Sequence, residues 1–110
     1  MEARRDDNER IATNESAFRR VNEGIERGRS PVASDERVGF VCECARLGCT
    51  ELVEVSIADY EAIRSHPRRF LIATGHEVEG EHVVSEAGGM AVVEKDGAAG
   101  RIAEARDPRC

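Results

Sequence analysis

Three cysteines gather in one short stretch of the chain. Cys42, Cys44 and Cys49 fall within eight residues, spaced C-x-C-x4-C, in a chain of 110 residues that has four cysteines. Thiolates this close together are typical of a metal site, because Zn²⁺ takes sulfur ligands at about 2.3 Å in a tetrahedron. A C-x-C pair reaches one ion from an extended or sharply turned backbone, and Gly48 allows a turn before the third thiol. The stretch therefore predicts three of the four ligands of a structural zinc site.

A histidine is the expected fourth ligand. His76 follows a strand-like run at 69–73 and a glycine, so a loop there can fold back onto the end of a neighbouring strand. His66 lies at the end of a helical pattern, where capping explains it, and His82 begins a predicted hairpin. We therefore predict His76, with His66, His82, Cys110, an acidic residue or water as the alternatives.

Cysteines so spaced also allow other chemistry. They could be buried as small apolar residues, or two of them could cycle through a disulfide, although neither C-x-C nor C-x4-C is the familiar redox spacing C-x-x-C. Most iron–sulfur clusters need a fourth thiolate, which would have to be Cys110. In a small domain whose core alone is marginal, a metal clamp is the interpretation we favour.

An enzyme is not predicted. A catalytic zinc keeps an open ligand position near a general base, and Glu43 and Glu77 do lie beside predicted ligands. However, a Cys3His set is closed and rich in sulfur. The sequence also lacks H-E-x-x-H, G-x-S-x-G, a P-loop and G-x-G-x-x-G.

The charge of the chain bears on its partners. Asp and Glu outnumber Lys and Arg by 22 to 16, a net charge of −6, which argues against bulk attraction to nucleic acid or anionic membranes. Arg64, Arg68 and Arg69 could still contact a phosphate, or could pair with acidic neighbours on a solvated face. The sequence has no apolar run of the roughly 20 residues that a membrane span needs and no signal-peptide pattern. We expect a cytoplasmic protein, in which thiols stay reduced.

The N-terminal segment reads as an amphipathic helix from Glu9 to about Arg27. The apolar residues of this segment fall on heptad positions a and d, with Asn14 in the remaining d position: Ile11, Phe18, Val21 and Ile25. This narrow seam either packs on the protein's own domain or on a second copy, or it docks on a different protein.

The chain as a whole is predicted to be α+β. The expected fold is a small zinc-stabilised antiparallel β domain with one short helix, preceded by the N-terminal helix. Residues 1–30 hold that helix and a frayed end, 31–37 a linker, 38–105 the zinc domain and 106–110 a tail. Within the domain we expect strands at 38–42, 51–55, 69–73, 82–86 and 90–94, a helix from Ser56 to about Ser65, and a last strand or short helix at 101–105.

The motifs of the zinc domain resemble a group of small uncharacterised proteins typical of GC-rich actinobacterial genomes. That group carries F-x-C-E-C-x4-C, then E-Y-E-x-x-R-x-x-P-x-R-F, then G-H-E. This chain has Phe40 to Cys49, Ala58 to Phe70 and Gly75-His76-Glu77 at the matching places, over about residues 38–95. The resemblance implies the limits of the domain and no activity. We expect a non-enzymatic adaptor or regulatory protein that docks through its N-terminal helix.

Overall fold

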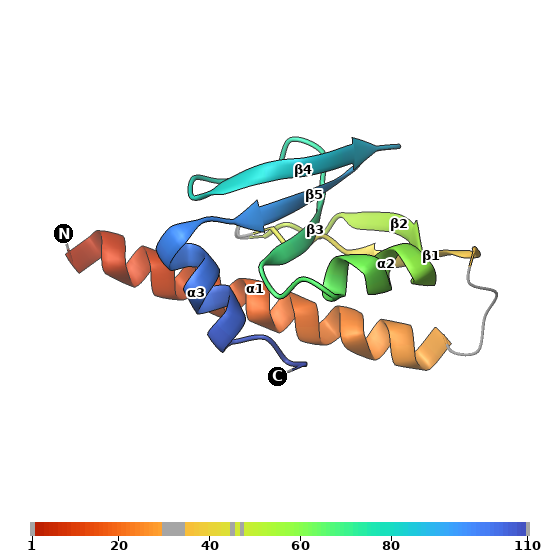
Figure 1. Cartoon of the computed structure of the whole chain (residues 1–110), viewed down its shortest axis with the longest axis horizontal. Helices are drawn as coiled ribbons and strands as arrows, with labels where there is room; N and C mark the ends of the chain where they lie inside the picture. Colours follow the sequence, from red (N-terminus) through yellow and green to blue (C-terminus); the bar gives the residue numbers. More distant parts are fainter. Residues whose placement is uncertain (1, 30–34, 45, 47, 110) are drawn as a thin grey trace.

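A computed structural model shows a small α+β protein with three helices and two antiparallel sheets in the described part of the chain (Figure 1). It describes residues 2–29, 35–44, 46 and 48–109, without the side chains of residues 2–12 and 29. The elements are α1 (Glu2–Arg29), β1 (Arg37–Val41), β2 (Leu52–Ser56), α2 (Ile57–Arg64), β3 (Arg69–Ala73), β4 (Glu81–Ala87), β5 (Met90–Lys95) and α3 (Gly97–Ala105). None of the helices in these ranges is long and apolar enough to cross a bilayer.

The two sheets follow the predicted strands closely. β1 pairs with β2, with Val41 opposite Leu52, and the other sheet has the order β3-β5-β4. The β4–β5 hairpin turns through Gly88 and Gly89, which have φ of 56° and 85°, values that favour glycine. The strands predicted from the alternating apolar pattern and from the glycine pair are therefore confirmed, to within one or two residues at their ends.

The second helix begins at its predicted cap. The Ser56 hydroxyl accepts a hydrogen bond from the Asp59 backbone N–H at 3.0 Å, the N-cap contact that the sequence indicates. This helix places Tyr60 and Ile63 in the core, and the Tyr60 ring stacks on Phe40 of β1 with centroids 4.3 Å apart. Residues 65–68 then lead into β3, whose Phe70, Leu71 and Ile72 are buried.

A third helix lies near the C-terminus, where the sequence leaves a last strand or a short helix open, and the structure selects the helix. The expected fold has one short helix besides the N-terminal one, whereas the structure has two, α2 and α3. The segment Gly97–Ala105 is rich in alanine and has a single β-branched residue, so local propensity favours helix. Asp96 stands at the N-cap, after β5 has ended at Lys95.

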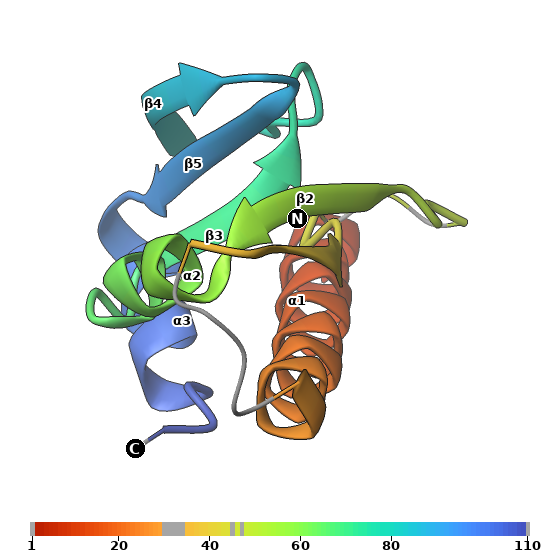
Figure 2. The ribbon, with the colours of Figure 1, turned by 90° about the vertical axis from the view of Figure 1, so that its right-hand side faces the viewer.

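The first helix lies along the body of the protein, beside β1 and α3 (Figure 2). Its buried described residues are polar or charged and recur at helical spacing: Glu15, Arg19, Asn22 and Glu23. The predicted apolar seam lies beside this face. Phe18 and Ile25 are half-buried, Ile25 against the core, while Val21 is 48% exposed. The side chain of Ile11 lies outside the described residues.

Candidate metal centre

Four side chains that could bind a metal converge at one point of the structure. Cys42, Cys44, Cys49 and His76 each offer a ligand atom, and these atoms all lie within 4.8 Å of one another. Cys42 and Cys44 are buried, while Cys49 and His76 are half-buried. The prediction that His76 joins the three cysteines is thereby confirmed as to position.

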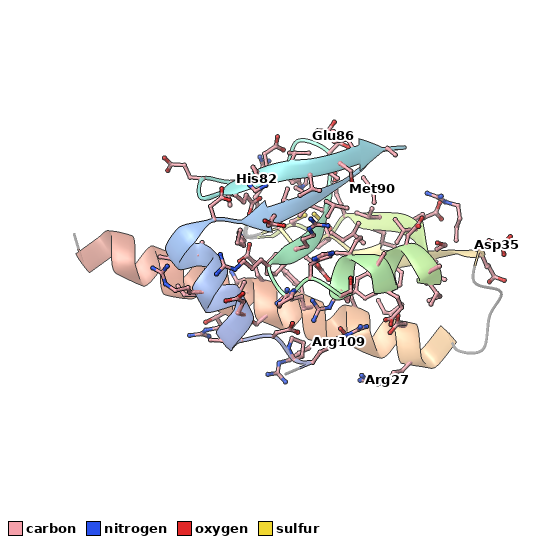
Figure 3. All side chains as sticks on the ribbon, viewed as in Figure 1. Arg27, Asp35, His82, Glu86, Met90 and Arg109 are labelled. Atoms are coloured by element: carbon pink, nitrogen blue, oxygen red, sulfur yellow. The ribbon has the colours of Figure 1, made fainter. Side chains whose placement is uncertain are left out.

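The other two histidines considered as the fourth ligand lie away from the cysteines. Figure 3 shows His82 on β4, where its Nδ1 lies 2.8 Å from Asp96 Oδ1. His66 follows the end of α2, and its backbone N–H donates to the carbonyl of Ile63. Cys110 lies outside the described residues.

The cysteine stretch directly follows β1 and continues the hydrogen bonding of the β1–β2 ladder. Beyond the end of β1, the Cys42 N–H still donates to the Glu51 carbonyl at 2.9 Å. The chain then crosses to β3, where the Glu43 N–H donates to the Leu71 carbonyl at 2.8 Å. Gly48, at φ 78°, allows the turn that returns Cys49 to the other two thiols. The cysteine stretch thus joins one sheet to the other.

His76 reaches the thiols through a tight turn after β3. Gly75 has φ of 88°, and the His76 N–H donates to the Ala73 carbonyl at 3.1 Å. His76 Nδ1 lies 3.6 Å from both Cys42 Sγ and Cys49 Sγ. A tetrahedral ion bound about 2.3 Å from sulfur and about 2.0–2.1 Å from nitrogen would hold two such ligand atoms about 3.6 Å apart. These two distances therefore match those of a tetrahedral site.

Burial keeps the thiols protonated when no metal is bound. Burial raises the pKa of Cys42 to about 12, against an opposing N–H···S hydrogen bond from Ala73 at 3.2 Å. Burial also raises the pKa of Cys44. Both groups are therefore neutral thiols near pH 7, and a metal must displace their protons.

We expect metal binding to release at least two protons per ion, because Cys42 and Cys44 bind as thiolates. If two protons leave, the apparent affinity rises by about a hundredfold per pH unit in the neutral range. Titration calorimetry in buffers that differ in ionisation enthalpy measures the number of protons released. Binding without proton release would show that the thiols are not the ligands.

The carboxylate of Glu51 lies beside the imidazole ring of His76. Glu51 Oε2 lies 3.3 Å from His76 Nε2, on the side of the ring away from the thiols. A metal-bound histidine commonly donates its second N–H to such a group, which fixes the tautomer and the ring orientation. Glu51 is therefore a positioning residue for the histidine ligand.

We expect Glu51→Gln to weaken metal affinity by about tenfold, because an outer-shell partner of a ligating histidine is typically worth about ten- to a hundredfold. Competition with a chromophoric chelator measures the affinity. Glu54→Gln, a change at an exposed glutamate of β2, is the matched control and should leave it unchanged. Equal affinities for the two variants would remove Glu51 from the site.

Glu43 is an important residue whose role sequence analysis missed. Its place beside a predicted ligand suggests an acid near a catalytic metal, but in the structure its carboxylate is fully buried among protein donors. Oε2 accepts hydrogen bonds from Asn22 at 2.7 Å and from the Tyr60 hydroxyl at 2.9 Å, and Oε1 accepts one from the Leu71 N–H at 2.9 Å. Successive side chains of an extended chain point to opposite sides. Because Cys42 and Cys44 point toward the metal site, the alternation predicts that Glu43 points the other way, toward the opposite side of the cysteine stretch.

The arginines considered for nucleic-acid contact are held in ion pairs. Arg64 is buried, with Nε 2.8 Å from Glu23 and Nη2 paired with Asp107. The other two pairs are Arg68 with Glu104 and Arg69 with Glu94, each at 2.9 Å. These three guanidinium groups therefore do not form a free basic surface.

The geometry supports a site that could bind a metal through three thiolates and one imidazole. Within the ranges that the structure describes, this is the one cluster of histidine, cysteine and acidic side chains found close enough to hold an ion. Comparison of the chain with protein-family models, curated proteins and solved structures finds no match.

Proposed function

We propose that the chain is a small non-enzymatic zinc protein in which a closed Cys3His site holds the fold together. The observation that carries this proposal is the convergence of three Sγ atoms and His76 Nδ1 within 4.8 Å of one another, with Nδ1 3.6 Å from two of the sulfurs. Three thiolates and one imidazole suit Zn²⁺, whereas Mg²⁺ and Ca²⁺ prefer oxygen ligands. A reducing compartment such as the cytoplasm keeps these thiols available to the metal.

A structural role is favoured over a catalytic one because the protein itself supplies all four ligands. A catalytic zinc keeps a position for water or substrate, and here two of the ligands, Cys42 and Cys44, are about 2% exposed. The nearest buried acid, Glu43, has its carboxylate engaged by Asn22, Tyr60 and Leu71. The metal would therefore connect β1 to the end of β3 and leave function to the surfaces that it stabilises.

Metal analysis tests the proposal directly. Protein purified without added zinc should contain about one zinc ion per chain by plasma mass spectrometry. His76→Ala should lose the metal or unfold, and His82→Ala, a change at a histidine of β4, is the matched control. A folded protein that contains no metal, or one that contains iron, would overturn the zinc proposal.

The adaptor role rests on the flank of α1. Phe18, Val21 and Ile25 lie beside the buried polar face, and Val21 is 48% exposed, one of the few large apolar side chains so exposed in the described residues. We infer that this flank, together with Ile11, docks on a protein partner or on a second copy.

A single exposed substitution tests this docking better than removal of the helix. Deleting α1 would also delete Glu15, Arg19 and Asn22, which pack on the domain. Val21→Ser should reduce self-association in sedimentation experiments, or reduce recovery of a bound protein in pull-downs. Arg20→Ser, a change at the adjacent exposed position, is the control. Equal behaviour of the two variants in both experiments would exclude this flank as the docking surface.

A further inference from the structure

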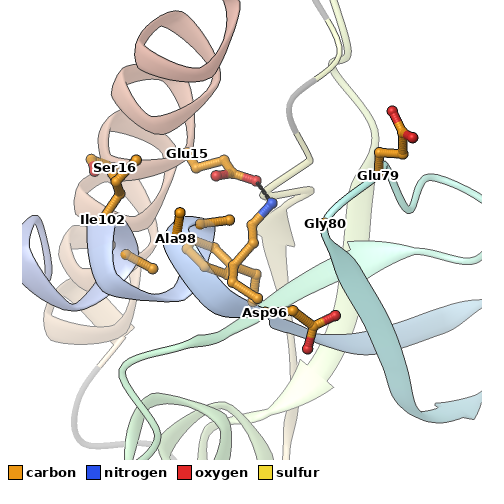
Figure 4. Close-up of a pocket in the computed structure, with 11 residues that line it drawn as sticks. Glu15, Ser16, Glu79, Gly80, Asp96, Ala98 and Ile102 are labelled. Atoms are coloured by element: carbon orange, nitrogen blue, oxygen red, sulfur yellow. Dashed lines mark ion pairs between the residues drawn. The ribbon is translucent and has the colours of Figure 1, made fainter. Parts of the chain in front are cut away.

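A second candidate site lies away from the cysteines, at the junction of α1, α3, β5 and the loop before β4 (Figure 4). It is a cavity of about 350 Å³. Its walls carry small or apolar groups: Phe70, Ala98, Ala99, Ile102 and Ala103. This volume can hold a small molecule of several heavy atoms, at the low end of ligand-binding pockets.

The floor of the cavity is a buried cluster of charges. Lys95 Nζ lies 2.5 Å from Glu15 Oε2 and also pairs with Glu81. The side chains of Lys95, Glu15 and Glu81 are 3%, 7% and 2% exposed. One ammonium group therefore faces two carboxylates. The nearby guanidinium of Arg19 offsets part of this excess negative charge, but it donates its hydrogen bonds to the backbone carbonyls of Pro67 and Ala103 and not to either carboxylate. Glu79 and Asp96 also line the cavity and add to the negative potential.

One oxygen of Glu15 has no donor. The ion pair uses Oε2, and the hydrogen bonds of the described residues leave Oε1 without a partner. In Figure 4 the Glu15 carboxylate lies among the side chains that line the cavity, and the dashed line marks its ion pair with Lys95. Burial raises the pKa of Glu15 to about 7, despite the nearby lysine, so the carboxylate is under-compensated where it lies. A carboxylate oxygen that lines a cavity and has no protein donor favours a ligand that brings both a donor and a positive charge.

We propose that this cavity binds the ammonium group of a small primary amine with a short apolar chain, and that Glu15 Oε1 accepts its hydrogen bond. The ligand's ammonium group and Lys95 together then give two cations for the two carboxylates of Glu15 and Glu81. The alkyl chain of the ligand lies against Ala98, Ala99 and Ile102. An organic anion fits less well, because Lys95 already serves two carboxylates and the rim is acidic. The site does not involve the proposed zinc ligands.

The zinc-loaded full-length protein can be titrated with n-butylamine and followed by ¹H–¹⁵N NMR. Saturable shifts are expected for the amides of Gly80, Ala98 and Ala99, which line the cavity. Sodium butyrate and 1-butanol, with chains of the same length but negative or no charge, should give no saturable shifts at these amides. Equal responses to the three compounds, or no saturable response to the amine, would overturn the proposal.

Two variants test separately whether amine binding depends on the charge of Glu15 and on the volume of the cavity. Glu15→Gln should weaken amine binding by at least about tenfold, since a charged hydrogen bond is typically worth about 1.5–3 kcal/mol. Ala98→Leu fills the cavity at an exposed position and leaves the ion cluster in place, so it should also abolish binding. Glu36→Gln, at an exposed glutamate away from the cavity, should change nothing. Unchanged amine affinity in either folded test variant would overturn the proposal.

Discussion

Replacing Cys44 with serine is expected to remove the metal and the cooperative thermal unfolding of the protein. Structural zinc contributes roughly 10–16 kcal/mol of apparent binding free energy in small domains, which is comparable to the roughly 5–15 kcal/mol by which native proteins are usually stable. Metal content and calorimetric unfolding of the purified variant measure both effects. Addition of a strong chelator to the unmodified protein should have the same result.

The reason for so large an effect is where the ligands lie. Cys42 follows β1, and His76 follows β3, so the ion would join the two sheets at the point where the backbone crosses between them. Cys110→Ser, the same change at the fourth cysteine, is the matched control and should retain full metal content. A metal-free Cys44→Ser protein that unfolds at the temperature of the unmodified chain would show that the site is dispensable for the fold.

Local patterns were enough to predict much of this fold. The alternating strands, the Ser56 cap and the glycine hairpin are each specified by neighbouring residues, and their places in the structure follow. The convergence of His76 on the cysteines was also predictable, because a glycine turn at the end of a strand restricts where the next side chain can go. These features depend on contacts over short stretches of chain or on a few spacing rules.

The packing of α1 could not be predicted in the same way. A heptad pattern assigns apolar residues to the buried face, yet here the buried face is charged and polar. Glu15 pairs with Lys95, and Arg19 donates to the carbonyls of Pro67 and Ala103 while its guanidinium lies 3.9 Å from the centroid of the Phe70 ring. Each partner is more than forty positions away in sequence. The residues near these charges in the sequence do not indicate burial. The same charged pattern on a helix without such distant partners would face solvent.

Asn22→Ala is expected to destabilise the metal-loaded protein by roughly 3–5 kcal/mol. The Asn22 side chain receives the Val41 N–H at 2.8 Å, donates to the Val41 carbonyl at 2.9 Å and donates to Glu43 Oε2 at 2.7 Å. Each lost neutral bond costs about 1 kcal/mol and the bond to a carboxylate more, because buried partners are left unsatisfied. Urea unfolding at a fixed excess of zinc measures the change in free energy, since free metal otherwise shifts apparent stability.

The control for this prediction lies on the same helix. Asn14 is half-buried, and its side chain makes no hydrogen bond within the described residues, so Asn14→Ala should cost no more than about 0.5 kcal/mol. A double-mutant cycle with Glu43→Gln isolates the link between α1 and the cysteine stretch. Because Glu43 lies between Cys42 and Cys44, a coupling between Asn22 and Glu43 should also appear as weaker metal affinity in Asn22→Ala. If Asn22→Ala and Asn14→Ala unfold alike, the helix is held by its other contacts and does not support the metal centre through Asn22.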